Sequence, residues 1–190
     1  MIDLEVVTAK KAMRKELREK LSRLCPCSRL EKSLFIQKKF IASDDFKNAD
    51  IIMTYVALHS EVDTTYLIDK SLAFGKKVVV PFVDVVTHMI IPVELRTRGE
   101  LVKGPYGILV PKDGAQNKVP LREIKTVIIP CLAFDKNNMR LGRGKGYYDR
   151  FLAREELSSS RTIGFAFNFQ IFDSLPFDPH DRNVNLVLTD

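Results

Sequence analysis

The sequence predicts an α/β fold: a three-layer, open and mostly parallel sheet with helices on both faces. Short apolar runs suited to buried strands alternate with segments whose apolar residues recur at helical spacing. The strand-like runs are continuously apolar, which is typical of parallel strands covered on both faces. With 190 residues, 45% of them hydrophobic, we expect one domain over residues 1–190, with a basic helical amino-terminal part (1–45) and a sheet core (46–190).

The amino-terminal part is predicted to contain two helices. From Thr8 onward, apolar residues recur on one helical face at Met13, Leu17, Leu21 and Leu24. Pro26 suits the end of this helix. Ser28 is expected to open the second helix, because Glu31 follows three residues later in the position of a capping box.

Strands and helices alternate beyond residue 45. The predicted strands are 51–56, 77–81, 89–95, 126–130, 162–167 and 186–189. We expect strand 89–95 at an edge, because Pro92 cannot donate a ladder hydrogen bond. Residues 96–122 are rich in Gly, Pro and charge and are predicted to form a loop.

Two helices are predicted within this core. One passes through Leu67 and Leu72, with Asp63 or Thr64 as its cap and Gly75 at its end. The other follows a glycine-rich loop and covers 147–157. Ligands of such sheets bind beyond the carboxyl ends of the parallel strands.

Composition excludes several classes of protein. No run of about 18 apolar residues is present, so no membrane span is expected, and residues 1–11 lack the features of a secretory signal. The three cysteines, Cys25, Cys27 and Cys131, suit a reducing compartment better than a disulfide scaffold. We therefore expect a cytoplasmic protein.

The basic residues are concentrated near the amino terminus. Residues 1–40 hold 11 Lys/Arg against 5 Asp/Glu, which accounts for the whole net charge of +6. Lys10, Arg14 and Arg18 form a stripe at i, i+4 spacing. Taken alone the stripe is best read as a solvated helix face, but the local excess of positive charge also suits a polyanion such as a nucleotide or a nucleic acid.

The stretch R-L-G-R-G-K-G-Y-Y-D from Arg140 to Asp149 carries the strongest functional signal. Its alternating glycines allow the backbone to approach a ligand closely, and amides at a helix start can hold an anion. The cations Arg140, Arg143 and Lys145 can bind phosphate oxygens. The stretch matches neither a Walker A loop nor the dinucleotide fingerprint. A solvent-exposed turn is the alternative interpretation.

Three acidic positions remain ambiguous from the residues alone. Asp149 lies in the first turn of a predicted helix, where it either stabilises the helix dipole or binds magnesium. Glu61 follows the first strand and is read first as a surface acid. The segment from Asp178 to Asp181 is read first as a turn and only second as a source of a metal ligand.

On these motifs the sequence resembles the 5-formyltetrahydrofolate cyclo-ligase family. The strongest match is R-L-G-R-G-K-G-Y-Y-D-R-F-L, residues 140–152, preceded by P-C-L-A-F-D at 130–135. Weaker matches in the same order cover nearly the whole chain: Lys10-Lys11-x-x-Arg14, Glu61-Val62-Asp63-Thr64, Gly75-Lys76-x-Val78-x-Val80-Pro81, Gly107-Ile108-x-x-Pro111, Phe169-Gln170, Leu175-Pro176 and His180-Asp181.

The resemblance implies ATP-dependent closure of 5-formyltetrahydrofolate to 5,10-methenyltetrahydrofolate with magnesium, releasing ADP and phosphate through an N5-iminium phosphate. The implied partners are ATP and 5-formyltetrahydrofolate, with or without a polyglutamate tail. Neither nucleic acid nor a membrane is expected as a partner, and the protein is expected to be a monomer.

The resemblance also implies which residues form the site. ATP would be bound by Lys10, Lys11, Arg14, Arg140, Leu141, Gly142, Arg143, Gly144, Lys145, Gly146, Tyr147 and Tyr148. The folate would be bound by Val56, Glu61, Arg143, Gly144, Lys145, Gly146 and Tyr147. Arg143 and Lys145 would be catalytic, and Asp149 and Asp181 would bind magnesium. The family usually has an acid shortly after His-Asp, where this chain has Val184-Asn185, a difference that bears on the ligand role of Asp181.

Two other functions compete with this interpretation. A non-catalytic module for RNA or polyphosphate would use the basic amino end, although the loop lacks a repeated aromatic platform. Another ATP-using or sugar-phosphate enzyme on a related sheet would leave Glu61 and the two tyrosines unexplained.

Overall fold

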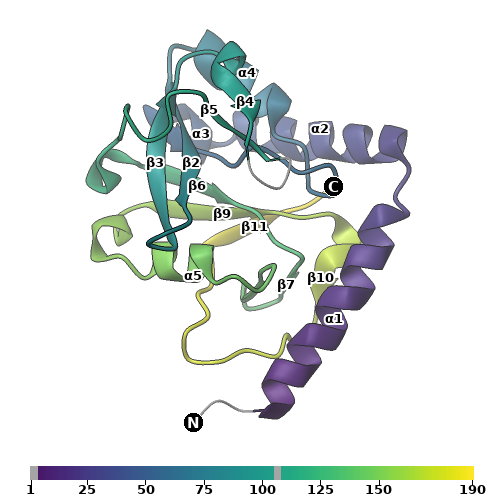
Figure 1. Ribbon diagram of the computed structural model, residues 1–190. Helices are drawn as coiled ribbons and strands as arrows, with labels where there is room; N and C mark the ends of the chain where they lie inside the picture. Colours follow the sequence, from purple (N-terminus) through teal and green to yellow (C-terminus); the bar gives the residue numbers. More distant parts are fainter. Residues whose placement is uncertain (1–3, 105–107) are drawn as a thin grey trace.

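The computed structural model describes residues 4–104 and 108–190, and its centre is a six-stranded sheet (Figure 1). The strand order is β11-β9-β6-β1-β2-β3, and every neighbouring pair is parallel except β2 and β3. The strands are β1 (Ile51–Met53), β2 (Lys77–Asp84), β3 (Met89–Leu95), β6 (Thr126–Ile129), β9 (Arg161–Phe165) and β11 (Leu186–Leu188). This confirms the open, mostly parallel α/β sheet, with β3 at an edge as expected.

Helices cover both faces of this sheet. On one face, Ile52 of β1 packs in a cluster with Phe40 and Leu67. Its neighbour Met53 points to the other face and packs in a cluster with Phe151. The first face is covered by α2 (Pro26–Ala42), α3 (Asp44–Lys47) and α4 (Thr65–Ala73), and the second by α5 (Tyr147–Leu152) with the 3-10 turns η3 (Leu121–Glu123) and η4 (Glu155–Leu157).

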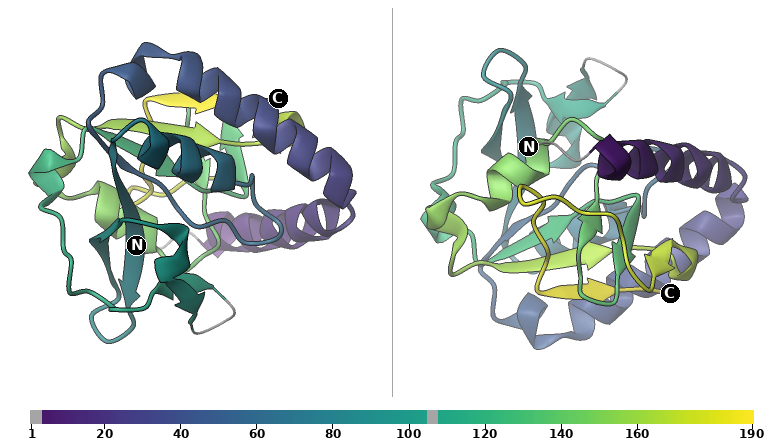
Figure 2. Two further views of the ribbon diagram at one scale, coloured as in Figure 1. Left: turned by 90° about the horizontal axis from the view of Figure 1, so that it is seen from above. Right: turned by 90° about the horizontal axis from the view of Figure 1, so that it is seen from below.

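A smaller sheet and α1 (Leu4–Ser22) complete one side of the molecule (Figures 1 and 2). The smaller sheet has the order β10-β7-β8, with β7 (Ala133–Asp135), β8 (Arg140–Leu141) and β10 (Ile171–Phe172), and the 3-10 turn η5 (Asn168–Gln170) precedes β10. Leu17 and Leu21 of α1 pack in the same cluster as Leu141 of β8. The amino-terminal helix therefore lies beside the start of the glycine-rich loop.

The helix boundaries in the amino-terminal part differ from the prediction. The first helix begins at Leu4 rather than at Thr8. The prediction that Ser28 opens the second helix is wrong: α2 begins at Pro26, and its N-cap residue Cys25 makes no side-chain capping bond. Proline suits this position because the first helical residue needs no N–H partner and its fixed φ is already helical.

Two predictions in the core also need correction. The helix expected over 147–157 ends at Leu152, and the chain continues into η4 instead. The segment 96–122 is not all loop, because it contains η1 (Arg98–Glu100), an antiparallel pair formed by β4 (Leu101–Lys103) and β5 (Leu109–Pro111), and η3. Gly107, a residue of one matched motif, lies outside the described residues.

Within residues 4–104 and 108–190, none of the helices combines the length and the apolar character that crossing a bilayer requires.

Candidate functional site

Two loops meet at one edge of the sheet. The first follows β1 and carries Glu61; the second follows β6 and, after β7 and β8, forms the glycine-rich loop up to Tyr147. Because β1 and β6 are parallel neighbours, their carboxyl ends lie at the same edge. The topology therefore brings together residues that are distant in the sequence.

The glycine-rich loop adopts a backbone that favours glycine at two positions. Gly144 and Gly146 have φ of +101° and +68°, in the region that other residues rarely adopt, and Gly146 is the N-cap of α5. A Cβ on Gly144 would lie 3.5 Å from the guanidinium of Arg14. The loop backbone can thus lie close to a cation of α1.

Two arginines of α1 hold this loop by its carbonyl groups. Arg14 Nε donates to the carbonyl oxygen of Gly142 (3.0 Å), and Arg18 Nη2 donates to that of Arg143 (3.0 Å). The basic stripe is therefore not only a solvated helix face: Arg14 and Arg18 face the loop. This leaves the amides of the loop, rather than these carbonyls, for a ligand.

Arg143 is paired with Glu61. Its Nε lies 2.9 Å from Glu61 Oε1, and its Nη2 donates to Ser60 Oγ at 3.0 Å. The other carboxylate oxygen, Oε2, accepts from the backbone N–H of Leu58 at 2.9 Å. Glu61 is 8% exposed, so this acid is buried beside a cation and is not the surface acid that its sequence position alone suggests.

Arg140 is buried beside Asp149. Arg140 Nη2 lies 2.5 Å from Asp149 Oδ1, and its guanidinium lies 5.7 Å from the ring centre of Tyr148. Arg140 Nε has no hydrogen-bond partner among the described residues. Burial raises the pKa of Tyr148, an effect that Glu61 reinforces and Arg140 opposes. The Tyr148 hydroxyl therefore stays protonated at neutral pH and can donate.

Lys10 is buried between two carboxylates from the other end of the chain. Its Nζ lies 2.6 Å from Asp178 Oδ2 and also pairs with Asp181 Oδ2. Burial alone would lower the pKa of Lys10, but the hydrogen bonds to both aspartates outweigh it and raise the pKa. The hydrogen bond from Lys10 in turn lowers the pKa of Asp178. The amine stays charged and joins the two chain ends.

The proposed metal ligands, Asp149 and Asp181, lie on elements that both approach Arg14. Burial lowers the pKa of Arg14, and the charges of Asp181 and Asp149 oppose this change. No cluster of three or more His, Cys, Asp or Glu side chains able to hold a metal occurs in the described parts of the chain. Two carboxylates do fit magnesium, which commonly takes its remaining ligands from phosphates and water.

Several predicted residues lie less directly at this site. Lys11 is exposed on α1, and its side chain makes no hydrogen bond or ion pair with described residues. Lys145 is also exposed, and its carbonyl accepts from Arg150 at 3.1 Å. Leu141 has a buried side chain in the core, so only its backbone can reach a ligand. Val56 lines a neighbouring hollow of about 390 Å³.

The structure adds four residues to the predicted set: Arg18, Ser60, Asp178 and Arg150. Arg18 belongs to the stripe noted in the sequence, and Asp178 lies three residues before Asp181, so both had a sequence signal. Arg150 donates to the carbonyl of His88 (3.1 and 3.0 Å) and so ties the loop to the β2–β3 turn. That contact joins segments 62 residues apart and has no signal in the sequence.

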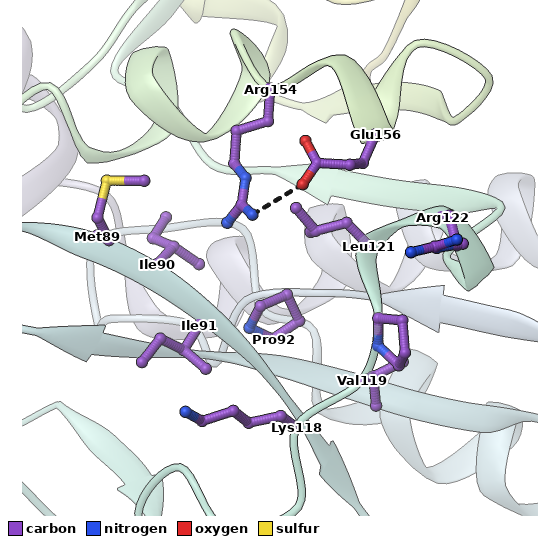
Figure 3. Close-up of a pocket in the computed structure, with 11 residues that line it drawn as sticks. Met89, Ile90, Ile91, Pro92, Lys118, Val119, Leu121, Arg122, Arg154 and Glu156 are labelled. Atoms are coloured by element: carbon purple, nitrogen blue, oxygen red, sulfur yellow. Dashed lines mark hydrogen bonds and ion pairs between the residues drawn. The ribbon is translucent and has the colours of Figure 1, made fainter.

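A larger hollow lies elsewhere (Figure 3). It measures about 620 Å³ and lies between β3, residues 118–122 and the segment after α5. The ion pair of Arg154 with Glu156 (3.0 Å) lies along it. None of the predicted site residues lines it, so volume alone does not locate the chemistry in this protein.

Fold and site together define an α/β protein with a cationic, glycine-rich loop suited to a polyanion at the carboxyl edge of its sheet. The model of the 5-formyltetrahydrofolate cyclo-ligase family matches residues 6–190. The chain belongs to this family and is a cyclo-ligase, as the resemblance in its motifs implied.

Individual relatives agree with the family match. A 5-formyltetrahydrofolate cyclo-ligase from Mus musculus is 32% identical over 196 aligned residues, covering 99% of this chain and 97% of its own. The solved structure of 5,10-methenyltetrahydrofolate synthetase from Aquifex aeolicus has a TM-score of 0.82 and 30% identity, with 95% of this chain and 89% of that chain covered. The synthetase of Mycoplasma pneumoniae has a TM-score of 0.74 and 27% identity, with coverages of 95% and 98%.

Proposed function

We propose that this protein closes 5-formyltetrahydrofolate to 5,10-methenyltetrahydrofolate at the expense of ATP, and that the reaction passes through an N5-iminium phosphate. One observation carries the proposal. Arg140 and Arg143 belong to the glycine-rich loop, Arg14 binds its backbone, and Lys10 lies one helical turn before Arg14, while positive φ angles in the loop let its backbone approach a ligand closely. Family membership supplies the substrate class.

The chemistry explains why ATP is needed. Ring closure by N10 must expel the formyl oxygen, which is a poor leaving group as oxide or hydroxide. If that oxygen first attacks the γ-phosphorus, ADP departs and an iminium phosphate forms. N10 then adds to the activated carbon, loses its proton, and inorganic phosphate departs with the former formyl oxygen. The protein mainly has to position both ligands and neutralise charge.

Arg143 is the best placed residue for the transferring group. It extends from the glycine-rich loop to Glu61, so it spans the space between the ATP loop and the loop that carries the folate residues. A planar guanidinium can bind two phosphate oxygens at once. Glu61, held by Leu58 and Arg143, would accept hydrogen bonds from the pterin N–H groups.

Three of these four cations are paired with carboxylates. Arg143 is paired with Glu61, Arg140 with Asp149, and Lys10 with Asp178 and Asp181. Binding of ATP would exchange these partners for phosphate oxygens, and Asp149 and Asp181 would then be free to hold magnesium. Magnesium would supply neutralisation of the phosphate charge. We therefore expect ATP and magnesium to bind much more tightly together than separately.

The test is to incubate the purified protein with 5-formyltetrahydrofolate, ATP and magnesium, and to follow the methenyl chromophore together with ADP release. We expect both products in equal amounts, and neither when ATP or magnesium is omitted. Arg23→Ala is a suitable control for loss of surface charge, because Arg23 is exposed on the described surface. A protein that binds ATP and magnesium yet leaves the folate unchanged would contradict the proposal.

A further inference from the structure

A hollow of about 390 Å³ is bordered by the loop that carries Glu61. It is lined by Val56, Ala57, Leu58 and His59 of the loop after β1, and the Leu58 N–H donates to Glu61 Oε2 at 2.9 Å. The opposite walls come from α4 and from the β4–β5 pair, which lie close together in Figure 1. These walls are apolar at Ile68, Leu101 and Leu109.

Arg29 lines this hollow with an unpaired charge. It lies in the first turn of α2 and is half-buried. Among the described residues, its guanidinium makes no hydrogen bond or ion pair, in contrast to Arg140 and Arg143, which are both paired. The nitrogens of Arg29 are not among the fully buried polar atoms that lack a partner, so they are accessible from the hollow. A guanidinium that lines a hollow without an intramolecular acceptor can bind an anionic ligand.

The acidic residue of the lining, Asp63, makes no ion pair with Arg29. Asp63 Oδ1 accepts from the Thr65 backbone N–H (2.9 Å), and Oδ2 accepts from the Thr65 hydroxyl (3.2 Å). Both oxygens are thus used to begin α4. Within residues 4–104 and 108–190, none of the carboxylates lies within salt-bridge distance of Arg29.

A second arginine in the hollow is only partly used. Arg98 Nε donates to Asp69 Oδ1 at 2.6 Å, and its side chain is 49% exposed. Its two terminal nitrogens have no hydrogen-bond partner within residues 4–104 and 108–190. The hollow therefore combines apolar walls with two guanidiniums, a combination suited to an aromatic ligand that carries carboxylates.

We propose that this hollow holds the tail of the folate substrate: the p-aminobenzoyl ring lies between the apolar walls, and Arg29 binds a glutamate carboxylate. Arg98 is then placed for a further carboxylate of a polyglutamate tail. The inference rests on the proposed function, because it assumes that the pterin lies at Glu61. The tail is attached to the pterin, and the hollow is lined by Leu58, whose N–H donates to Glu61.

The hollow in Figure 3 lacks this relation to the site. It contains Lys118, Arg122 and Arg154, but Arg154 is paired with Glu156 and no residue of the loop after β1 lines it.

The decisive measurement is direct binding of p-aminobenzoyl-diglutamate, a probe that contains the tail without the pterin, by isothermal titration calorimetry. We expect Arg29→Gln to weaken binding about tenfold or more, because the variant loses a charge-assisted hydrogen bond to the glutamate carboxylate. Arg29→Lys should restore part of the affinity. Lys38→Gln is the matched control, since Lys38 is exposed on the same helix, and it should leave binding unchanged.

Kinetics provide the second measurement. Arg29→Gln should raise KM for 5-formyltetrahydrofolate with kcat and KM for ATP nearly unchanged, and Arg98→Gln should act mainly on polyglutamylated substrate. Wild type and Arg29→Gln should turn over 5-formyltetrahydropteroate, which lacks the glutamate, equally well. A larger KM for this truncated substrate in the variant would contradict a role confined to the tail.

The inference is overturned if the probe does not bind the wild-type protein at millimolar concentration, or if Arg29→Gln binds it as tightly as wild type. Failure of the proposed function appears differently, as absence of the methenyl chromophore with the wild-type protein. A folding defect in Arg29→Gln would lower ATP binding as well, and Arg98→Gln then tests the hollow independently.

Discussion

Arg143 occupies the position at which the two substrates would meet. It belongs to the glycine-rich loop, yet its guanidinium contacts Ser60 and Glu61 of the loop after β1. A residue in this position can bind the phosphate group that moves from one ligand to the other. The pairing with Glu61 and Ser60 holds the guanidinium between the two loops.

Replacing Arg143 tests this role. We expect Arg143→Ala to lower the single-turnover rate about a thousandfold or more, in line with arginines that stabilise transferring phosphoryl groups. Far-ultraviolet circular dichroism should stay unchanged, because the side chain is partly exposed. Near-normal turnover would remove Arg143 from this step, and Arg23→Ala should retain full activity.

Glu61→Gln separates the two substrates. The amide keeps the size of the side chain and one acceptor oxygen but loses the charge that faces Arg143 and that would face the pterin in the proposed complex. We expect KM for 5-formyltetrahydrofolate to rise about tenfold, while the Kd of ATP changes less than threefold. Titration calorimetry measures both ligands. An equal loss for both would indicate a folding defect rather than a folate-binding role.

Lys10 and Lys11 form a matched pair of variants on one helix. Lys10 is buried between Asp178 and Asp181, whereas Lys11 is exposed. We expect Lys10→Ala to weaken magnesium–ATP binding about tenfold or more, because it leaves two carboxylates unneutralised where phosphate should bind. Lys11→Ala should change it less than threefold. Similar losses of magnesium–ATP affinity in the two variants would contradict a specific role for Lys10.

At the scale of elements, the small sheet packs against the main sheet at a glycine. A Cβ on Gly164 of β9 would lie 2.2 Å from Cζ of Phe134 in β7, and Phe134 is fully buried. The ring therefore occupies the space that a side chain would need. This contact limits how closely β7 of the small sheet approaches β9 of the main sheet.

Gly164→Ala should consequently destabilise the fold. We expect a loss of about 1–3 kcal/mol in the free energy of unfolding, which is typical of overpacking a filled core. Urea unfolding followed by circular dichroism measures it. Gly99→Ala is the control, because its added Cβ would have its nearest contact at 3.5 Å from Thr97 Oγ1. Wild-type stability in Gly164→Ala would mean that Phe134 can move freely.

Some element boundaries could be predicted from the sequence, and others could not. Strand β6 was predictable because all four of its residues are apolar or β-branched and all are buried. The end of α5 was not, since residues 153–157 contain neither glycine nor proline. The chain turns there because Leu157 packs into the core cluster that contains Phe151. Such long-range packing overrides local propensity.

On the scale of the whole molecule, ion pairs hold both ends of the chain. Lys10 of α1 pairs with Asp178 and Asp181, and Lys32 of α2 pairs with Asp190. The first cluster places α1 against the carboxy-terminal segment, and so positions Arg14 and Arg18 beside the loop. The site therefore depends on the two ends meeting.

The Lys10 cluster should make stability depend on pH in acid. The hydrogen bond from Lys10 lowers the pKa of Asp178 below its ordinary value of 3.8. A carboxyl whose pKa is lower in the folded state stabilises the fold above its unfolded pKa, and this stabilisation is lost as pH falls through the folded pKa. Wild type should therefore exceed Asp178→Asn in stability by a constant amount above about pH 5.

The difference should shrink as pH falls below about 4. Thermal unfolding of both proteins across the acid range measures it. Asp173→Asn is the control, because Asp173 pairs with Lys136 in an exposed position where a salt bridge contributes little. A difference that does not change with pH would show that the charge of Asp178 is not what stabilises the fold.

The sequence by itself determined the alternation of strands and helices, the family, and the glycine-rich loop, because apolar spacing and the conformational freedom of glycine are local properties. Only the tertiary structure decided that Arg143 meets Glu61 across 82 residues and that Lys10 meets Asp181 across 171. A charge reveals its partner only after the topology has brought the two together, and burial then makes that pairing necessary.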